Sequence, residues 1–125
     1  MIGKRKLKQS NFMSSSRIPK VEDFLRKEIS QIISSQVQDL RFKSLNIVDV
    51  KASSDLGVAT VFFTIIDGGK EQAPDQKALE KFASMMRSKL SSFMTIRRVP
   101  KLIFKYDESL ERYNSIDALL NSLSD

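Results

Sequence analysis

The 125-residue chain lacks cysteine, histidine and tryptophan. Without cysteine it has no disulfide framework, no thiolate metal site and no thiol nucleophile. Without histidine it lacks the commonest general base and metal ligand of proteins. Its apolar runs are short and interrupted by charged residues, so none predicts a membrane span. Its basic start is not followed by an apolar segment, which argues against a secretory signal, and we expect a cytoplasmic protein.

Motifs for catalysis and nucleotide binding are also missing. Gly69 and Lys70 do not form a phosphate-binding loop, because no glycine lies five residues before Gly69. The serines have no histidine to activate them and belong to no Ser–Lys motif. The acids within 107–111 suit a helix start better than a cation site. We therefore expect no enzyme activity, no catalytic or metal-binding residue, no cofactor and no small-molecule substrate.

Charge is distributed unevenly along the chain, whose net charge is +6. Residues 1–20 contain six basic residues and no acid, whereas 21–125 contain fifteen of each sign. Within that neutral part, 81–106 contains seven basic residues and no acid, and 107–125 contains five acids and one arginine. Such polarity indicates a polyanionic partner, although a charged run can also be no more than a solvated face.

Two stretches have the periodicity of amphipathic helices. The first covers residues 17–37, with Pro19 in its expected first turn. The second follows Ala73-Pro74-Asp75 and continues to about residue 95. The predicted core stripe of the first helix is Val21, Phe24, Leu25, Ile29, Ile32, Ile33 and Val37. That of the second is Leu79, Phe82, Ala83, Met86, Leu90, Phe93 and Met94.

Three further segments are rich in strand-forming residues. Residues 46–53 and 58–66 predict a hairpin, with Gly57 able to adopt a positive φ in the turn. In its first strand we expect Val48, Val50 and Ala52 to share one face. Residues 99–106 predict a third strand, reached through a helical crossover that would place it parallel to a neighbour. The predicted fold is α+β, a three-stranded sheet with helices packed on one face.

Basic residues near the second helix and third strand form the candidate binding surface. Lysine and arginine neutralise phosphates and so supply affinity that does not depend on sequence. The candidate RNA-binding residues are Arg41, Lys43, Lys81, Ser84, Arg87, Ser88, Lys89, Arg97, Arg98, Lys101 and Lys105.

Several stretches occur in the order and spacing of the ribosome-binding factor A family, which the chain resembles over about residues 17–123. The most specific is V-P-x-L-x-F-x-Y-D-x-S-L, from Val99 to Leu110. The others are 26–29, 39–41, 54–56, 59–61, 87–88 and 97–102. The chain departs from the family at Phe82-Ala83-Ser84, where the family has an Ala-x-Gly kink, at Leu40, which replaces a proline, and at Thr95, where the family often has arginine.

The resemblance implies a type II KH-like fold, α-β-β-α-α-β, with a kink that splits the second helix. Apolar residues at helical spacing within 107–124 separately predict a short C-terminal helix. Residues 1–16 are polar and show no periodicity, so we expect a disordered basic arm there, followed by the KH-like RNA-binding domain over 17–110 and a helical tail over 111–125. The implied function is that of an assembly factor that binds ribosomal RNA of the immature small (30S) subunit. It would act as a monomer in late maturation and rRNA processing, and would help growth in the cold.

Two other functions remain open. One is a KH-like module that binds free single-stranded RNA, although the chain has no Gly-x-x-Gly loop to clamp an RNA backbone. The other is a protein-interaction adaptor that uses strand edges and the acidic tail. Salt dependence separates the adaptor from the RNA-binding proteins, because only phosphate binding releases many counterions.

Overall fold

The computed structural model describes residues 6–92, 99–109 and 120, with side chains described from residue 17 onward. In chain order the elements are α1 (Lys6–Gln36), α2 (Leu40–Lys43), β1 (Leu45–Ala52), β2 (Val58–Ile65), the 3-10 helix η1 (Lys70–Gln72), α3 (Gln76–Ser91) and β3 (Lys101–Tyr106). The sheet order is β1-β2-β3, with β1 antiparallel and β3 parallel to β2. The α+β class, the hairpin and the parallel third strand are therefore confirmed.

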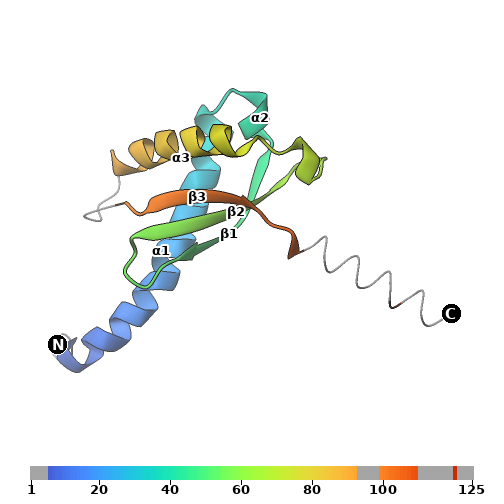
Figure 1. Cartoon of the computed structure of the whole chain (residues 1–125). Coiled ribbons are helices and arrows are strands. Elements are labelled where there is room, and N and C mark those ends of the chain that lie inside the picture. The colour runs from blue at the N-terminus through green and yellow to red at the C-terminus, as the bar shows by residue number, and fades with distance from the viewer. Residues whose placement is uncertain (1–5, 93–98, 110–119, 121–125) are drawn as a thin grey trace.

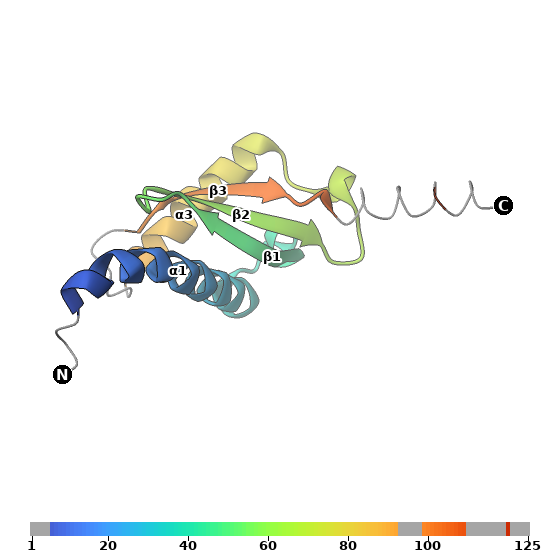
Figure 2. The same ribbon diagram turned by 90° about the horizontal axis from the view of Figure 1, so that it is seen from below.

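One face of the sheet forms the core with α1 and α3. In Figure 1, α1 crosses behind the strands and α3 runs alongside β3, and Figure 2 shows α1 below the sheet. Every second residue of β2 is buried, and the buried Val61 lies opposite Val50 of β1 and Phe104 of β3. On the other face, Phe62 is half-buried and Ile103 is 39% exposed. Burying each large apolar side chain on the helix-covered face contributes about 1.5–3 kcal/mol.

The face pattern of β1 differs from the simple alternation that we expected. Its register with β2 shifts between Ile47 and Asp49, which inserts one extra residue as a β-bulge. Ile47 and Val50 consequently share the buried face, whereas Val48 is exposed. The predicted grouping of Val48 with Val50 and Ala52 is wrong because that extra residue reverses the alternation.

Helix α1 is longer than the sequence predicted. Residues 6–16 were expected to be disordered, but they are helical and continuous with 17–36, which contains no glycine. Pro19 is thus an interior residue of the helix, where its missing N–H leaves one carbonyl without its usual donor. Phe24 is 41% exposed, because it projects about 100° from Leu25, beyond the edge of the buried stripe.

Helix α3 continues through the expected kink without a break. Its sixteen residues include Ala83 and Ser84, and Ala83 is buried with the rest of the stripe from Leu79 to Leu90. The two helices that the resemblance implied between β2 and β3 are one helix over Gln76–Ser91. The local sequence explains this result, because alanine favours helix and no glycine is present to break it. The predicted C-terminal helix lies largely outside the described residues.

In the β1–β2 turn, the residue with a positive φ is not the one that the sequence predicted. Leu56 has φ 58°, whereas no described glycine has a positive φ. The Asp55 carboxylate holds the turn by accepting hydrogen bonds from the Gly57 N–H at 2.9 Å and the Ser53 hydroxyl at 2.8 Å. The prediction for Gly57 is therefore wrong, and the turn confines a β-carbon-bearing residue to a region that costs about 1–2 kcal/mol.

Candidate nucleic-acid interface

A groove of about 580 Å³ lies where the end of α1 and the short α2 meet one side of α3; we call it the α2/α3 groove. Four basic side chains line it, Arg41 from α2 and Lys77, Lys81 and Lys89 from α3. Residues four apart on a helix are neighbours on one face, so these lysines form a ridge along one side of α3. Within the described residues, Lys77 and Lys81 have no hydrogen bond or ion pair, and their charge is available to a ligand.

The groove has an apolar floor. The rings of Phe42 and Phe82 stack with their centroids 4.3 Å apart and their planes 6° from parallel. Phe82 also meets Phe104 of β3 edge to face, with centroids 5.3 Å apart, which joins the floor to the sheet. Met85, between Lys81 and Lys89 on the ridge, is 37% exposed in the groove. The floor is thus an extension of the core and is held in a fixed position.

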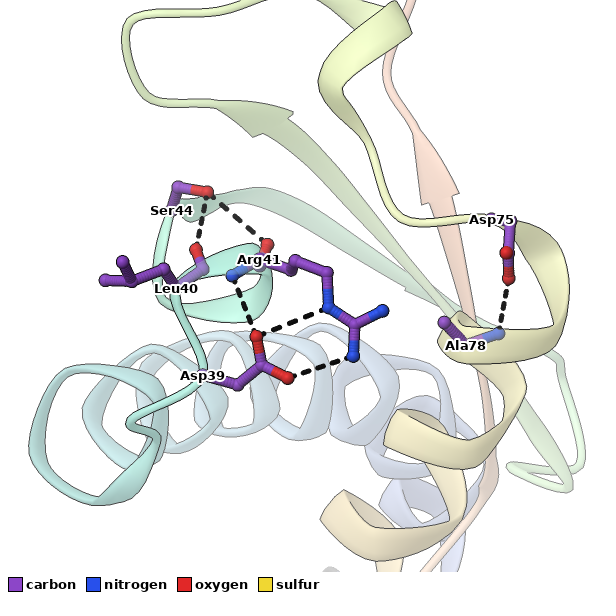
Figure 3. Close-up of polar contacts among 6 residues, drawn as sticks. All are labelled: Asp39, Leu40, Arg41, Ser44, Asp75 and Ala78. Atoms are coloured by element: carbon purple, nitrogen blue, oxygen red, sulfur yellow. Dashed lines mark hydrogen bonds and ion pairs between the residues drawn. The ribbon is translucent and has the colours of Figure 1, made fainter.

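Asp39 caps α2 and fixes Arg41 at the same time. Its Oδ1 accepts hydrogen bonds from the Arg41 backbone N–H at 3.0 Å and from Nε at 3.3 Å, and its Oδ2 accepts from Nη2 at 3.0 Å (Figure 3). The side-chain hydrogen bonds with Arg41, and then the backbone one, lower the pKa of Asp39 below its usual value. The same pairing raises the pKa of Arg41. The guanidinium carbon also lies 5.1 Å from the centroid of the Phe42 ring.

The two acids of the groove are engaged with the protein itself. Asp39 is held by Arg41, and Asp75 caps the first turn of α3 by accepting a hydrogen bond from the Ala78 N–H at 2.8 Å (Figure 3). An aspartate at each helix start satisfies N–H groups that have no partner within the helix. Four cations and two such acids leave the groove electropositive overall.

A second groove, of about 410 Å³, runs between α3 and the edge strand β3; we call it the α3/β3 groove. Ser84, Arg87 and Lys101 are the predicted site residues that line it. Arg87 donates from Nε and Nη2 to the Val99 carbonyl oxygen, at 3.1 and 3.0 Å. Because this bidentate contact anchors the chain just before β3, Arg87 has a structural role that the sequence did not indicate.

The other predicted residues that the structure describes do not form one surface. Lys43 donates a hydrogen bond to the Ser34 carbonyl near the end of α1, at 2.9 Å, where a cation also stabilises the negative end of the helix dipole. Lys105 is exposed on the sheet face away from the helices, opposite Phe62. Ser88 is exposed on α3. Arg97 and Arg98 lie outside the described residues.

Sequence reasoning missed two parts of this interface. Lys77 was not among the candidate RNA-binding residues, although it lies in the ridge with Lys81 and Lys89. Helix α2 was not predicted, because four residues are too few to show a period. The available signal was Asp39, an N-cap residue type that stands directly before the helix and two residues before Arg41.

The described residues contain no cluster of three acidic side chains placed to hold a metal ion. No helix in that part of the chain is both long and apolar enough to cross a membrane.

The fold and the grooves together define a small α+β protein with an electropositive groove suited to a polyanion. A model of the family described as "Ribosome-binding factor A" matches residues 17–120. Ribosome-binding factor A of Staphylococcus carnosus is 38% identical over 111 residues, which cover 89% of this chain and 96% of that protein. The Staphylococcus saprophyticus protein of that name is 36% identical over 107 residues, covering 86% and 94%. The chain therefore belongs to the ribosome-binding factor A family.

The fold also agrees with a solved structure. The crystal structure of ribosome-binding factor A from Thermus thermophilus matches with a TM-score of 0.60 and 24% identity. The match covers 71% of this chain and 93% of that one. At this level of identity the similarity concerns the fold alone.

Proposed function

We propose that this protein is a non-enzymatic assembly factor that binds the immature small ribosomal subunit through its ribosomal RNA. The observation that carries the proposal is the α2/α3 groove, where Arg41, Lys77, Lys81 and Lys89 converge from two helices. RNA is the polyanion that a ribosome offers, and such side chains bind its phosphates with little dependence on sequence. The family name supports the ribosomal partner, and the groove supports the chemistry of contact.

The finer parts of the proposal concern when and how the protein acts. Docking holds a local RNA conformation during late maturation and rRNA processing, including in the cold, until a later event releases the protein. The protein acts in the cytoplasm as a monomer, without catalysis or a cofactor. Its fold is a variant of the type II KH architecture in which α3 runs straight across the family's kink position. The unbroken helix supports this variant, because it keeps Lys77, Lys81 and Lys89 in a single row.

Salt dependence is the first test. Phosphate contacts from the three lysines of the groove predict that the logarithm of the association constant for small subunits falls with that of salt concentration with a slope of about −2 to −3. The slope is measured by co-sedimentation of the full chain with immature small subunits over a salt series. A slope near zero contradicts electrostatic RNA binding and favours the protein adaptor.

Paired charge reversals locate the surface. Lys77→Glu with Lys81→Glu should reduce the slope by about two and weaken subunit binding, without unfolding the chain, because both side chains are exposed. The matched control is Lys20→Glu with Lys51→Glu, which changes the net charge equally at exposed sites outside both grooves. Equal weakening by both pairs would show that binding follows net charge and not the groove.

The sequence adds Arg97 and Arg98 to the proposed contact, since they lie in the basic segment that joins α3 to β3. Changing both to glutamate should weaken co-sedimentation, and undiminished co-sedimentation would exclude them. Competition between small subunits and short single-stranded RNA separates the subunit factor from a module for free RNA. Preference for the short RNA would contradict the proposal.

A further inference from the structure

The guanidinium of Arg41 is oriented more tightly than a phosphate contact requires. Its Nε and Nη2 edge is bound to both carboxylate oxygens of Asp39, at 3.3 and 3.0 Å. One side of the group is turned toward the Phe42 ring, with the guanidinium carbon 5.1 Å from the centroid. The side chain nevertheless remains 61% exposed, and it lines the α2/α3 groove. The exposed part therefore includes the second face of a fixed, flat cation.

Arg41 is the outermost member of a column of planar groups. Below it lies Phe42, which is stacked on Phe82 at 4.3 Å, and Phe82 meets Phe104 at the sheet. Both rings of the stacked pair are buried, at 7% and 5% exposed, so neither of them can stack on a ligand. The open position of the column is above Arg41, in the groove. Arginine planes and aromatic rings are the surfaces on which proteins stack unpaired bases.

The lysine ridge lies beside this open position. Lys77 and Lys81 are one helical turn apart, about 6 Å along the axis, on the α3 side of the same groove. Met85 adds a flexible apolar contact further along the ridge. A flat apolar-cationic surface bordered by free ammonium groups matches a nucleobase followed by phosphates. The volume of about 580 Å³ is within the range of sites that enclose a small ligand.

We propose that the α2/α3 groove binds one unpaired nucleotide of single-stranded RNA, with its base stacked on the exposed face of Arg41 and its flanking phosphates on Lys77 and Lys81. This inference rests on the proposed function, since it takes RNA as the partner. It goes further by dividing the basic residues of one groove between two roles. Asp39 is the positioning residue, because its two side-chain contacts hold the guanidinium over the Phe42 ring.

Two variants that keep or increase positive charge isolate stacking from phosphate binding. Arg41→Lys keeps the charge but loses the plane and its two-point contact with Asp39. Asp39→Ser keeps an N-cap hydroxyl for α2 but frees the guanidinium, and it makes the groove more positive. A groove that bound only phosphates would bind equally well with the first variant and more tightly with the second. Arg26→Lys is the matched control, because it makes the same exchange at an arginine that is paired with Asp23 outside both grooves.

The assay measures binding of the full chain to oligoadenylate by fluorescence anisotropy at low salt, with thermal melting to confirm folding. A chain of abasic ribose phosphates of equal length is the second probe. We expect Arg41→Lys and Asp39→Ser each to weaken oligoadenylate binding about fivefold or more, and to leave abasic binding unchanged or tighter. Arg26→Lys should bind both probes as the wild type does.

Three results would overturn the inference. The first is wild-type affinity of both Arg41→Lys and Asp39→Ser for oligoadenylate. The second is the same loss on the abasic chain, which would make Arg41 a phosphate contact. The third is binding of adenosine monophosphate as tightly as oligoadenylate, which would indicate a free nucleotide as the ligand. None of these results would contradict salt-dependent binding of the wild type to small subunits, so this inference can fail while the proposed function stands.

Discussion

Replacing Arg87 by methionine tests whether this arginine holds the fold or contacts RNA. The wild-type guanidinium donates two hydrogen bonds to the Val99 carbonyl, and Val99 is only 4% exposed. A hydrogen bond to a charged group contributes about 1.5–3 kcal/mol, and a buried carbonyl left without a donor costs about 1–3 kcal/mol. Because water can reach part of this contact, we expect Arg87→Met to lower the free energy of unfolding by about 2 kcal/mol. For a chain of this length the melting temperature should fall by about 8 °C.

Thermal and urea unfolding followed by far-ultraviolet circular dichroism measure this loss, since the chain has no tryptophan. Lys81→Met is the matched control, because it removes an exposed cation from the same helix and should change stability by less than about 0.5 kcal/mol. Arg87→Lys keeps one charged donor and should lose about half as much as Arg87→Met. The reasoning is refuted if Arg87→Met has the same melting temperature and free energy of unfolding as Lys81→Met. Weaker subunit binding without lost stability would instead make Arg87 an RNA contact.

Three further substitutions test local contacts. Glu22→Ala should lower the free energy of unfolding in urea by about 1–2 kcal/mol, because the Glu22 carboxylate accepts a hydrogen bond from the half-buried Ala52 N–H at 2.8 Å. Glu22→Gln keeps an acceptor and should lose less stability. Leu56→Gly should raise the free energy of unfolding by about 0.5 kcal/mol, because glycine removes the strain of a φ of 58°, and this gain exceeds the loss from the larger entropy of glycine in the unfolded chain. A lower stability would show that the packing of Leu56 outweighs the strain. Arg41 lowers the pKa of Asp39, so the stability from this pair is present above about pH 4 and is lost as pH falls through the lowered value. The urea midpoint of the wild type should therefore fall more steeply than that of Asp39→Ser between pH 5 and 3, and parallel curves would contradict the pairing.

The sequence predicted the elements whose patterns extend over many residues. The stripe of α3 from Leu79 to Leu90 is buried as expected, because the period of a sixteen-residue helix repeats several times. The extra residue in β1 was not predictable, since a bulge changes the phase of the alternation by one position and leaves no compositional mark. The four residues of α2 were missed for the opposite reason, since they are too few to have a period.

The candidate site was predicted less well than the fold, because sequence shows charge but not the partners of charge. Lys43 and Arg87 were selected as cations, yet each donates to a backbone carbonyl and stabilises a chain connection. Lys77 was passed over, although its ammonium group is free in the described part of the chain and lines a groove. Whether a cation is bonded or free depends on where the carbonyls of Ser34 and Val99 lie in space. Their positions are set by the packing of α1, α3 and β3.

The difference between free cations and cations already bonded to the protein explains why the α2/α3 groove is the stronger candidate for the interface. A cation already bound to protein oxygen must lose or share that bond when it binds phosphate, and this reduces its net contribution. In the α3/β3 groove, Arg87 would have to lose or share its hydrogen bonds to the Val99 carbonyl. In the α2/α3 groove, Lys77 and Lys81 have no such bond to lose within the part of the chain that the structure describes. Arg41 is also bound, but through one edge, so its free face can stack on a base while its contact with Asp39 remains intact. Among the described residues, the groove therefore combines two free charges with one oriented plane, so Lys77, Lys81 and Arg41 can bind a phosphate backbone and a base without breaking a contact of their own, whereas Lys89 would have to share its hydrogen bond to Gln36.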